Sequence, residues 1–591
     1  MTPRRLVLRI QVLAVIVGMV SCLWLADSRA DENGKADVVL QHGKIYTADR
    51  ARSFQQSIAF TGNSIVAIGH DNKVKLLVGP KTKVVDLGGK LVLPGMIDTH
   101  SHPIDSVVER TKCSLADIEV KPPTIEALKP VIRECLREKP GGPNHWLEVV
   151  QLYNYGFKAT AYDLDKIEKK RPIALYGNDG HTVWVNRRGL ALLGITRDTP
   201  DPHDGKIHRD ASGTPTGLLL EGAMDLVGDI SSPPTIEEQA SLTAAALNNM
   251  SANGITSLMD ACVEPTGEAV WRQLYRTGNL DMRVRMAICL DDPNDDSDEM
   301  VAQLVETSKK DNVDPNFLRA GVVKVYADGV LEYPSQTAAL LAPYLHTPTK
   351  TCGALYIDDS FAKLVTKLDA AGLAVHVHAI GDKAVRKTLD AFAAARRANG
   401  DRDNRHQIAH LELVNPADFP RFKALGVIAD FQLLWARREP ATVEAVKPYL
   451  GPKRYRYLYP AGSLLKAGAT IVGGSDWAVS SYNPFCAFQN AVTRGGGKGQ
   501  KPLNIDQKIP LTAAVDAYTI NAAFAMKQDT TTGSLEVGKR ADLVILDRDI
   551  FTVDANTIAD TEVLATYLDG RLVYTAPASG TSRMQRCDEI Y

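Results

Sequence analysis

The sequence predicts an α/β protein, a (β/α)8 TIM-type barrel with a small β-sandwich formed by both ends of the chain. Two observations support this fold class. In the middle of the chain, short apolar runs typical of buried strands alternate with amphipathic helical stretches. Two β-rich segments, residues 37–92 and 533–575, bracket that middle. Strands that alternate with helices of roughly 10–15 residues indicate a parallel sheet, and this many units favour an eightfold barrel.

The β-sandwich is predicted from β-branched runs interrupted by Gly and Asn. Such runs cover residues 37–49, 57–69 and 83–95 near the start of the chain. The same pattern returns in residues 533–549 and 562–575. Short β-branched runs bounded by turn residues are typical of a meander. We therefore expect one sandwich made from residues 31–94 and 531–575, followed by a polar tail, 576–591.

The barrel is predicted from a series of strand and helix candidates within residues 95–530. Buried strands are expected at residues 322–330, 373–381, 406–414, 426–434 and 469–476. Helices are expected between them at residues 358–372, 381–400 and 416–426. In a barrel of this kind the chemistry lies at the carboxyl ends of the strands, so the residues that follow each strand are the first candidates for a site.

Composition and charge restrict the class of partner. The 591-residue chain has 45% hydrophobic and 23% charged residues, as in soluble globular proteins. A formal net charge of −2 provides no general attraction to nucleic acid or to an anionic membrane. We therefore expect a small-molecule substrate as the partner, with a homo-oligomer also compatible with the sequence.

The first thirty residues are predicted to be a signal peptide. Three arginines within the first nine residues precede an apolar stretch, residues 10–26, and a small-x-small cleavage site ends at Ala30. The arginines also resemble a twin-arginine signal. Alternatives are an uncleaved anchor and a lipoprotein-type signal at Cys22. We expect export to the periplasm or outside the cell, with the mature chain starting near Asp31.

Seven cysteines remain after the predicted signal peptide. None of them forms a C-x-x-C pair, so the sequence lacks a zinc-ribbon or thioredoxin-type motif. Export permits a disulfide, but the cysteine spacing does not select one.

Histidine and aspartate side chains gather at four predicted strand ends. His100 and His102 are two residues apart, and side chains at i and i+2 lie on the same face of a strand. His378, His410 and Asp476 end three further strands. Imidazole and carboxylate are the ligands of zinc and similar cations. We expect one or two divalent metal ions per chain, with zinc the first choice.

His376 competes with His378 for a ligand role because the two share one face of a strand. The residues that follow, "HAIGD", favour His378 as the side chain at the mouth of the barrel. His376 would then lie one layer deeper, as a supporting or core residue.

Several motifs together resemble the amidohydrolase superfamily. They are "LPGMIDTHSH" (93–102), "HVHAIGDKAV" (376–385), "RHQIAHLELV" (405–414), "GGSDWAV" (473–479) and "GSLEVGKRADLVILD" (533–547). The sequence looks most like the YtcJ-like branch, amidohydrolase family 3, which includes N-substituted formamide deformylases. The resemblance runs from about residue 37 to 574. It implies a metal-dependent hydrolase on a barrel with the sandwich predicted above.

The resemblance also assigns a role to Lys324 and an insertion to the barrel. In the family a lysine at this strand end reacts with CO2, and its carbamate bridges two metal ions, whereas an ordinary ammonium has no lone pair for a cation. A plain buried lysine is the alternative.

The long interval between His102 and Lys324 implies an inserted small domain at about residues 104–234. That insertion contains His181 and Trp184, which we expect to contact substrate; a surface His and a core Trp are the alternative.

Two departures from the family pattern concern the substrate. Ala409 precedes His410 where the family usually has an acidic residue, and residues 430–436, "DFQLLWA", lack the proline and histidine often found there. Both departures lie beside the expected pocket. They therefore do not affect the predicted metal site, but they leave the identity of the substrate undecided.

The resulting hypothesis is an exported hydrolase of amide or N-acyl, including N-formyl, C–N bonds. Metal-activated water would attack, and Asp476 would take its proton and return it to the leaving nitrogen. Hydrolysis of an ester, carbamate or cyclic amide by the same site is one alternative. A non-catalytic binding or regulatory protein on the same fold is the other.

Overall fold

The computed structural model describes residues 34–588, except for 119, 203–204, 229, 231–232, 348–349, 497–498 and 578–583. The predicted signal peptide, residues 1–30, lies outside the described residues. Among the described helices, none combines the length and the apolar character that crossing a bilayer requires.

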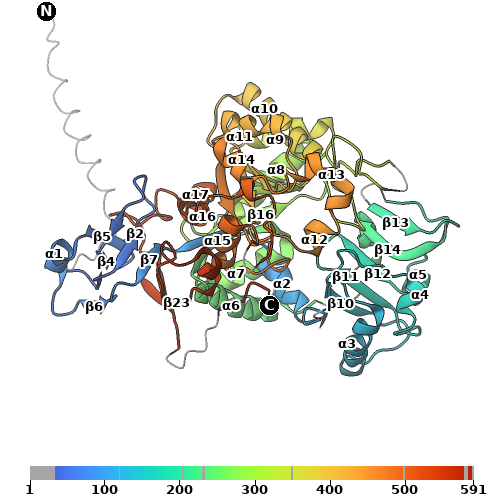
Figure 1. Cartoon of the computed structure of the whole chain (residues 1–591), viewed down its shortest axis with the longest axis horizontal. Helices are drawn as coiled ribbons and strands as arrows, with labels where there is room; N and C mark the ends of the chain where they lie inside the picture. The colour runs from blue at the N-terminus through green and yellow to red at the C-terminus, as the bar shows by residue number, and fades with distance from the viewer. Residues whose placement is uncertain are drawn as a thin grey trace, which may run out of the picture.

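Eight parallel strands form the centre of the molecule (Figure 1). In chain order they are β8 (Met96–Ser101), β15 (Ile255–Val263), β16 (Arg283–Cys289), β17 (Leu318–Tyr326), β18 (Ala374–Ala379), β19 (Gln407–His410), β20 (Ile428–Phe431) and β21 (Thr470–Gly473). Each strand pairs with the next along the chain. At the seam between the last and the first, the Asp476 amide donates to the His100 carbonyl at 2.7 Å. The predicted barrel is thereby confirmed.

Helices between the strands cover the barrel, as expected of βα units. They are α6 (Ile236–Ala252), α7 (Pro265–Arg276), α8 (Asp298–Asp311), α9 (Asp359–Ala370), α10 (Asp382–Asn399), α11 (Phe419–Leu425), α14 (Ala461–Lys466), α15 (Pro484–Thr493), α16 (Leu511–Ala517) and α17 (Ile520–Ala525). The three helices predicted from sequence correspond to α9, α10 and α11. Local signals set their ends: the Asp358 side chain caps α9 by accepting from the Ser360 amide, and α10 stops at Gly400, with φ of +80°.

Both chain ends build the sandwich beside the barrel. One sheet has the order β5 (Ser64–Gly69), β4 (Ser57–Thr61), β1 (Val38–Gln41) and β6 (Lys83–Asp86). The other has the order β24 (Arg571–Thr575), β23 (Val563–Leu568), β22 (Leu543–Leu546), β7 (Leu91–Pro94), β2 (Lys44–Tyr46) and β3 (Phe54–Gln55). Strand β7 pairs with β22 from the far end of the chain, so the blue and red segments of Figure 1 meet in one sheet. Buried side chains from both sheets, such as Phe60 and Leu543, share one apolar core.

Gly95 makes the step from sandwich to barrel. Its amide donates to the Asp542 carbonyl at 2.8 Å, which continues the pairing of β7 and β22. A Cβ at this position would lie 2.4 Å from Oγ1 of Thr256 on β15. Only glycine therefore lets the chain pass from β7 into β8 so close to its neighbour.

The inserted segment forms a second small unit with its own six-stranded sheet, which lies at the opposite end of the molecule from the sandwich (Figure 1). The sheet order is β13 (Gly205–Arg209), β14 (Pro215–Glu221), β12 (Thr182–Val185), β11 (Ile173–Gly177), β10 (Leu147–Leu152) and β9 (Cys113–Ser114). Its helices are α3 (Ile125–Glu138), α4 (Ala161–Leu164) and α5 (Arg187–Leu192). Two apolar cores, one on each face of the sheet, hold the unit together.

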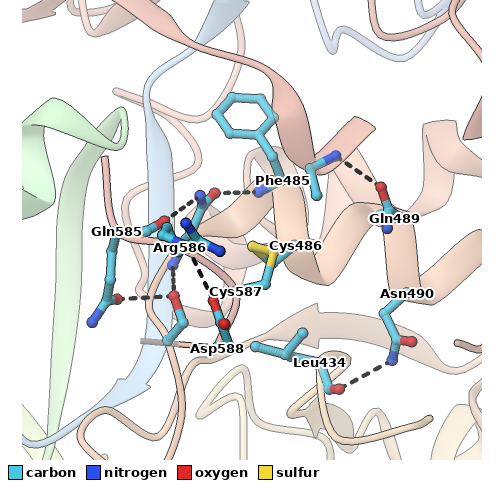
Figure 2. The surroundings of a disulfide bond; sticks show 12 residues. Leu434, Phe485, Cys486, Gln489, Asn490, Gln585, Arg586, Cys587 and Asp588 are labelled. Carbon is cyan, nitrogen blue, oxygen red and sulfur yellow. Dashed lines mark hydrogen bonds and ion pairs between the residues drawn. A yellow bond between two sulfur atoms is a disulfide. The ribbon is translucent and has the colours of Figure 1, made fainter. Parts of the chain in front are cut away.

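Three disulfides join six of the described cysteines, Cys113–Cys135, Cys262–Cys289 and Cys486–Cys587, whereas Cys352 is free. Figure 2 shows the third bond, which ties the end of the chain to α15. Gln585 reinforces this attachment, because its side-chain oxygen accepts from Ser481 Oγ and from the Tyr482 amide, both at 2.9 Å. Residues 584–588, expected as part of a polar tail, are thus fastened to the barrel.

Candidate active site

The predicted metal ligands gather at the carboxyl ends of the barrel strands, around a cavity of about 1120 Å³. His100 lies on β8 with His102 directly after it, Lys324 on β17, His378 on β18 and His410 at the end of β19. Asp476 follows β21 by three residues. All of these side chains line the cavity, and all except His102 are at least nine-tenths buried; they are His100, Lys324, His378, His410 and Asp476.

Asp476 is the centre of the group. Its Oδ1 lies 3.2 Å from His102 Nε2 and 3.5 Å from His100 Nε2, and its Oδ2 lies 3.9 Å from His410 Nδ1. Lys324 Nζ lies 3.3 Å from His100 Nε2. Side chains from four different strands therefore point toward one place, and the ligand atoms of His100, His410 and Asp476 all lie within 4.8 Å of one another.

The backbone at two of these positions is strained. His410 has φ of +75° and Asp476 has φ of +53°, in the left-handed region that non-glycine residues rarely adopt. Such strain, held in place by a packed scaffold, is concentrated at functional sites. Gly474 provides part of the scaffold, since a Cβ there would lie 2.5 Å from Cβ of His100.

His376 supports His100 from below. Its Nε2 lies 2.8 Å from His100 Nδ1, and its Nδ1 lies 3.0 Å from Gln407 Oε1. This chain of contacts fixes the ring of His100 and leaves its Nε2 directed at Lys324 and Asp476. His376 also belongs to a second metal-compatible set, with His100 and Asp430, whose two carboxyl oxygens have no hydrogen-bond partner among the described residues.

His378 faces the cavity with a different orientation. Its ring centroid lies 4.4 Å from that of His410, and its Nε2 lies 3.2 Å from the Gly329 carbonyl oxygen. In this tautomer Nε2 carries the proton and donates to Gly329, so Nδ1 keeps the lone pair that a metal ligand needs.

Burial determines the protonation of the cluster. Desolvation, with the charge of Lys324 as a further cause, lowers the pKa of His100, His376, His378 and His410 well below the ordinary value. Burial alone would also lower the pKa of His102, but its hydrogen bond to Asp476 and the Asp476 charge outweigh burial and raise that pKa. The neutral imidazoles of His100, His378 and His410 beside a carboxylate are a donor set for a divalent metal ion, and the unpartnered Asp430 oxygens add to that fit.

The inserted sheet contributes His181 to the cavity wall. Its Nδ1 lies 2.6 Å from Glu221 Oε2, and Glu221 Oε1 accepts from Thr337 Oγ1. Burial alone would lower the pKa of His181, but the charge and hydrogen bond of Glu221 and the charge of Asp179 raise it to about 9. The His181 ring lies 5.4 Å from that of His378, so the insertion brings a positive charge beside the predicted metal ligands.

Trp184 corrects a prediction. Only 1% of its surface is exposed, and its ring packs edge-on at 5.3 Å against Phe157 inside one core of the insertion. It does not line the cavity. Residues 183–185 are apolar on both faces of their strand, and that pattern indicates a buried strand between two cores.

The outer wall of the cavity contains residues that sequence reasoning missed. Glu332, Glu412, Tyr155, Tyr459 and Trp435 all line it. The Trp435 ring lies parallel to that of His410, with centroids 5.6 Å apart. Burial raises the pKa of Glu332 and of Glu412, and each lies near the negative charge of other acids.

Comparisons with known proteins place the chain in a family. A sequence model described as "Amidohydrolase family" matches residues 83–574. The chain is 30% identical over 554 residues to Protein LONG AFTER FAR-RED 3 of Arabidopsis thaliana, covering 91% of this chain and 92% of the relative. It is 27% identical to N-substituted formamide deformylase of Arthrobacter pascens, covering 92% and 99%.

The fold has solved counterparts. An uncharacterized metal-dependent hydrolase from Pyrococcus horikoshii superposes with a TM-score of 0.67 at 24% identity, over 88% of this chain and 99% of that one. The family match and the observed barrel confirm the relationship that the motifs predicted. The chain therefore belongs to the amidohydrolase family and is a hydrolase that acts on carbon–nitrogen bonds.

Proposed function

We propose that this enzyme hydrolyses an amide or N-acyl compound, N-formyl amides included, and that it does so after export from the cytoplasm. The position of Asp476 is the observation that supports the reaction. Its Oδ1 lies within 3.5 Å of Nε2 of both His100 and His102, at the base of an open cavity. The name of the Arthrobacter pascens relative, N-substituted formamide deformylase, supports the substrate class.

Different residues carry out different steps of amide hydrolysis. A divalent ion held by these histidines and Asp476, with zinc the first choice, would polarise the substrate carbonyl and lower the pKa of water. Asp476 accepts the proton of the attacking water and delivers it to the leaving nitrogen. The cation of His181, held by Glu221, binds and orients the polar part of the substrate from the inserted sheet.

Lys324 is proposed to carry a carbamate. Its side chain is fully buried, and burial lowers its pKa to about 8, so a fraction of the amine is neutral near pH 7. The neutral nitrogen adds to the carbon of CO2, a C–N bond forms, and one proton leaves to solvent. The product is an anionic carboxylate analogue beside His100, suited to hold one ion or bridge two.

One experiment joins metal content with activity. Purified protein, as isolated and after incubation with zinc or manganese, is analysed for metal and tested on N-acyl amines, N-acyl amino acids and formamides. We expect one or two ions per chain and turnover of an amide. Metal near zero in both samples would contradict the site, and turnover of esters alone would contradict the bond type.

The Lys324→Ala variant tests the carbamate. We expect loss of activity and of at least one ion, with partial recovery of both on addition of a short carboxylate such as propionate. Unchanged metal content and turnover would show that Lys324 is a structural residue.

The three disulfides support the proposal of export, because such bonds persist in oxidising compartments. N-terminal sequencing of the protein from its native host is expected to find a chain that starts near Asp31. An intact Met1 on a cytosolic protein would contradict export.

A further inference from the structure

Two buried carboxyl groups on the outer wall of the cavity form no salt bridge among the described residues. Glu332 is 6% exposed and Glu412 is 2% exposed, and both line the cavity. Oε2 of Glu412 has no hydrogen-bond partner among the described residues. A buried carboxyl group is costly to leave without compensation, so this pair requires an account.

The Lys and Arg side chains of the cavity do not pair with these two acids. The lining contains thirteen Asp or Glu residues and three Lys or Arg residues. Each of the three bases is engaged elsewhere: Arg437 Nε lies 3.0 Å from Glu439 Oε2, Lys324 contacts His100, and Lys121 lies over the ring of Tyr153. His181, which Glu221 holds as a cation, also lies near Glu332 and, against the larger effect of burial, lowers its pKa. Acids nevertheless outnumber bases in the lining, and this excess favours a ligand that carries positive charge.

Aromatic rings accompany the two acids. Tyr155 from the insertion and Tyr459 lie near them, because the charges of both acids add to burial in raising the pKa of each tyrosine. Trp435 lines the cavity beside His410. The faces of such rings attract cations, and carboxylates flanked by aromatic rings suit a protonated or quaternary amine better than a bare metal ion. The rings also add apolar contact for the carbon atoms next to the charge.

The wall is rigid enough to select a ligand. Arg494, 1% exposed, donates to the carbonyl oxygens of Leu458 and Tyr459 at 3.0 and 3.1 Å. The Tyr459 amide donates in turn to the Glu412 carbonyl oxygen at 2.7 Å. Glu412 itself lies two residues after His410, so the chain links this wall directly to the metal-type centre.

We propose that Glu332 and Glu412, with Tyr155, Tyr459 and Trp435, form a subsite for an ammonium group, so that the preferred substrate is an amide bearing a positive charge away from the scissile bond. This inference rests on the proposed function and specifies its substrate class. The scissile amide lies at the metal-type centre, and the ammonium group lies among the carboxyl groups and aromatic rings of the outer wall.

A set of matched amides tests the selectivity. The cationic members are mono-N-acetyl and mono-N-formyl derivatives of 1,4-diaminobutane and 1,5-diaminopentane, with 5-aminopentanamides placing the charge on the acyl side. N-acylpentylamines are the neutral partners, and N-acyl-5-aminopentanoates are the anionic ones. We expect kcat/KM to be about 10- to 100-fold higher for a cationic amide than for its neutral partner, and lowest for the anion. Equal or better turnover of the neutral amide would overturn the inference.

A binding measurement separates this inference from the proposed function. Metal-free protein is titrated with n-pentylammonium, tetramethylammonium and n-pentanol by calorimetry. Binding of at least one ammonium ion, with none for the alcohol, supports the subsite even if the reaction is different. Folded protein that binds neither ammonium ion overturns the subsite, whichever amides it hydrolyses.

The variants Glu332→Gln and Glu412→Gln locate the subsite. Each keeps the shape of the side chain and removes the charge, and Glu306→Gln is the matched control, because Glu306 lies on α8 with its side chain 78% exposed. We expect the cationic-to-neutral ratio of kcat/KM to fall at least tenfold in the first two variants and to stay constant in the control. Loss of metal would lower kcat/KM for the cationic and the neutral amide together and would leave their ratio unchanged. A folded variant that keeps the wild-type ratio therefore contradicts the assignment.

Discussion

The metal-type centre and the outer wall of the cavity are the inner and outer ends of the site, and both hold buried acids that different side chains accompany. At the inner end, Asp430 lies near His100, whose neutral imidazole keeps the lone pair of Nε2, and near His376, which supports that ring. At the outer end, Glu332 and Glu412 lie among aromatic rings, which offer π-faces. Lone pairs favour an inorganic cation and π-faces favour an organic one. The side chains beside a buried carboxylate therefore indicate which kind of cation it binds.

Asp476→Asn affects the inner end most. Asparagine keeps the shape and one oxygen but cannot accept the proton of the attacking water, so we expect turnover to fall by about 10²–10⁴ on neutral and cationic amides alike. Metal content, thermal stability and single-turnover rates are compared with those of the wild type. A folded, metal-loaded variant with near-normal turnover would remove Asp476 as the proton carrier.

Glu221→Gln tests the group that lies between the two ends. Without the Glu221 charge, the pKa of His181 falls from about 9 toward its ordinary range, and the cation on the wall is lost at lower pH. We expect kcat/KM to drop by about 10- to 100-fold, with the basic limb of its pH profile moved to lower pH. Thr337→Val removes one hydrogen bond to Glu221 and keeps its charge, so it serves as the milder control. An unmoved basic limb in Glu221→Gln would contradict the pairing.

Cys587→Ser tests the rim of the outer end. Cys587 and Asp588 line the cavity, and the bond to Cys486 holds them there. We expect KM to rise a few-fold with little change in kcat, because this bond contributes no side chain to the predicted metal ligands. Cys135→Ser breaks a disulfide inside the core of the insertion and is the matched control for lost stability, about 2–4 kcal/mol in either case. Equal KM values in the two variants would show that the attached tail does not shape the cavity.

Asp369 is, by contrast, a buried carboxylate whose hydrogen-bond partners all belong to the protein. Burial opposes its charge, but hydrogen bonds from His406, Asn399 and Asn404 outweigh burial and lower its pKa to about 2. A folded pKa below the unfolded value gives stability that is complete above pH 4 and disappears as pH falls through about 2. Asp369→Asn should therefore lower Tm by about 1–2 °C at pH 6. Calorimetry should find the gap from wild type narrowing between pH 4 and pH 2, and a constant gap would contradict the assignment.

The inner end of the cavity could be predicted from sequence because its residues follow a rule of position. His100, His410 and Asp476 come at the ends of apolar strand segments, and parallel strands in a barrel bring those ends together. The sandwich was equally predictable, since β-branched runs at both chain ends have few alternatives to pairing.

The outer end could not be predicted in this way. Glu332, Tyr155 and Tyr459 come from three loops far apart in the sequence, and only the folded chain brings them together. No periodicity distinguishes these residues from other loop residues. The error at Trp184 has a related cause: its neighbour His181 lies in a turn that faces the cavity, whereas the strand that follows turns Trp184 into a core.

The pairing of β7 with β22 also has a consequence for the order of events during synthesis. The two strands are separated by about 450 residues, which a ribosome adds in roughly 20–90 s. Until then β7 has an unpaired edge on one side, and the closing strand of the barrel, β21, is itself translated only about 70 residues before β22. The active enzyme is therefore assembled only after nearly the whole chain has been translated, and the open edge of β7 can pair with another chain in the meantime.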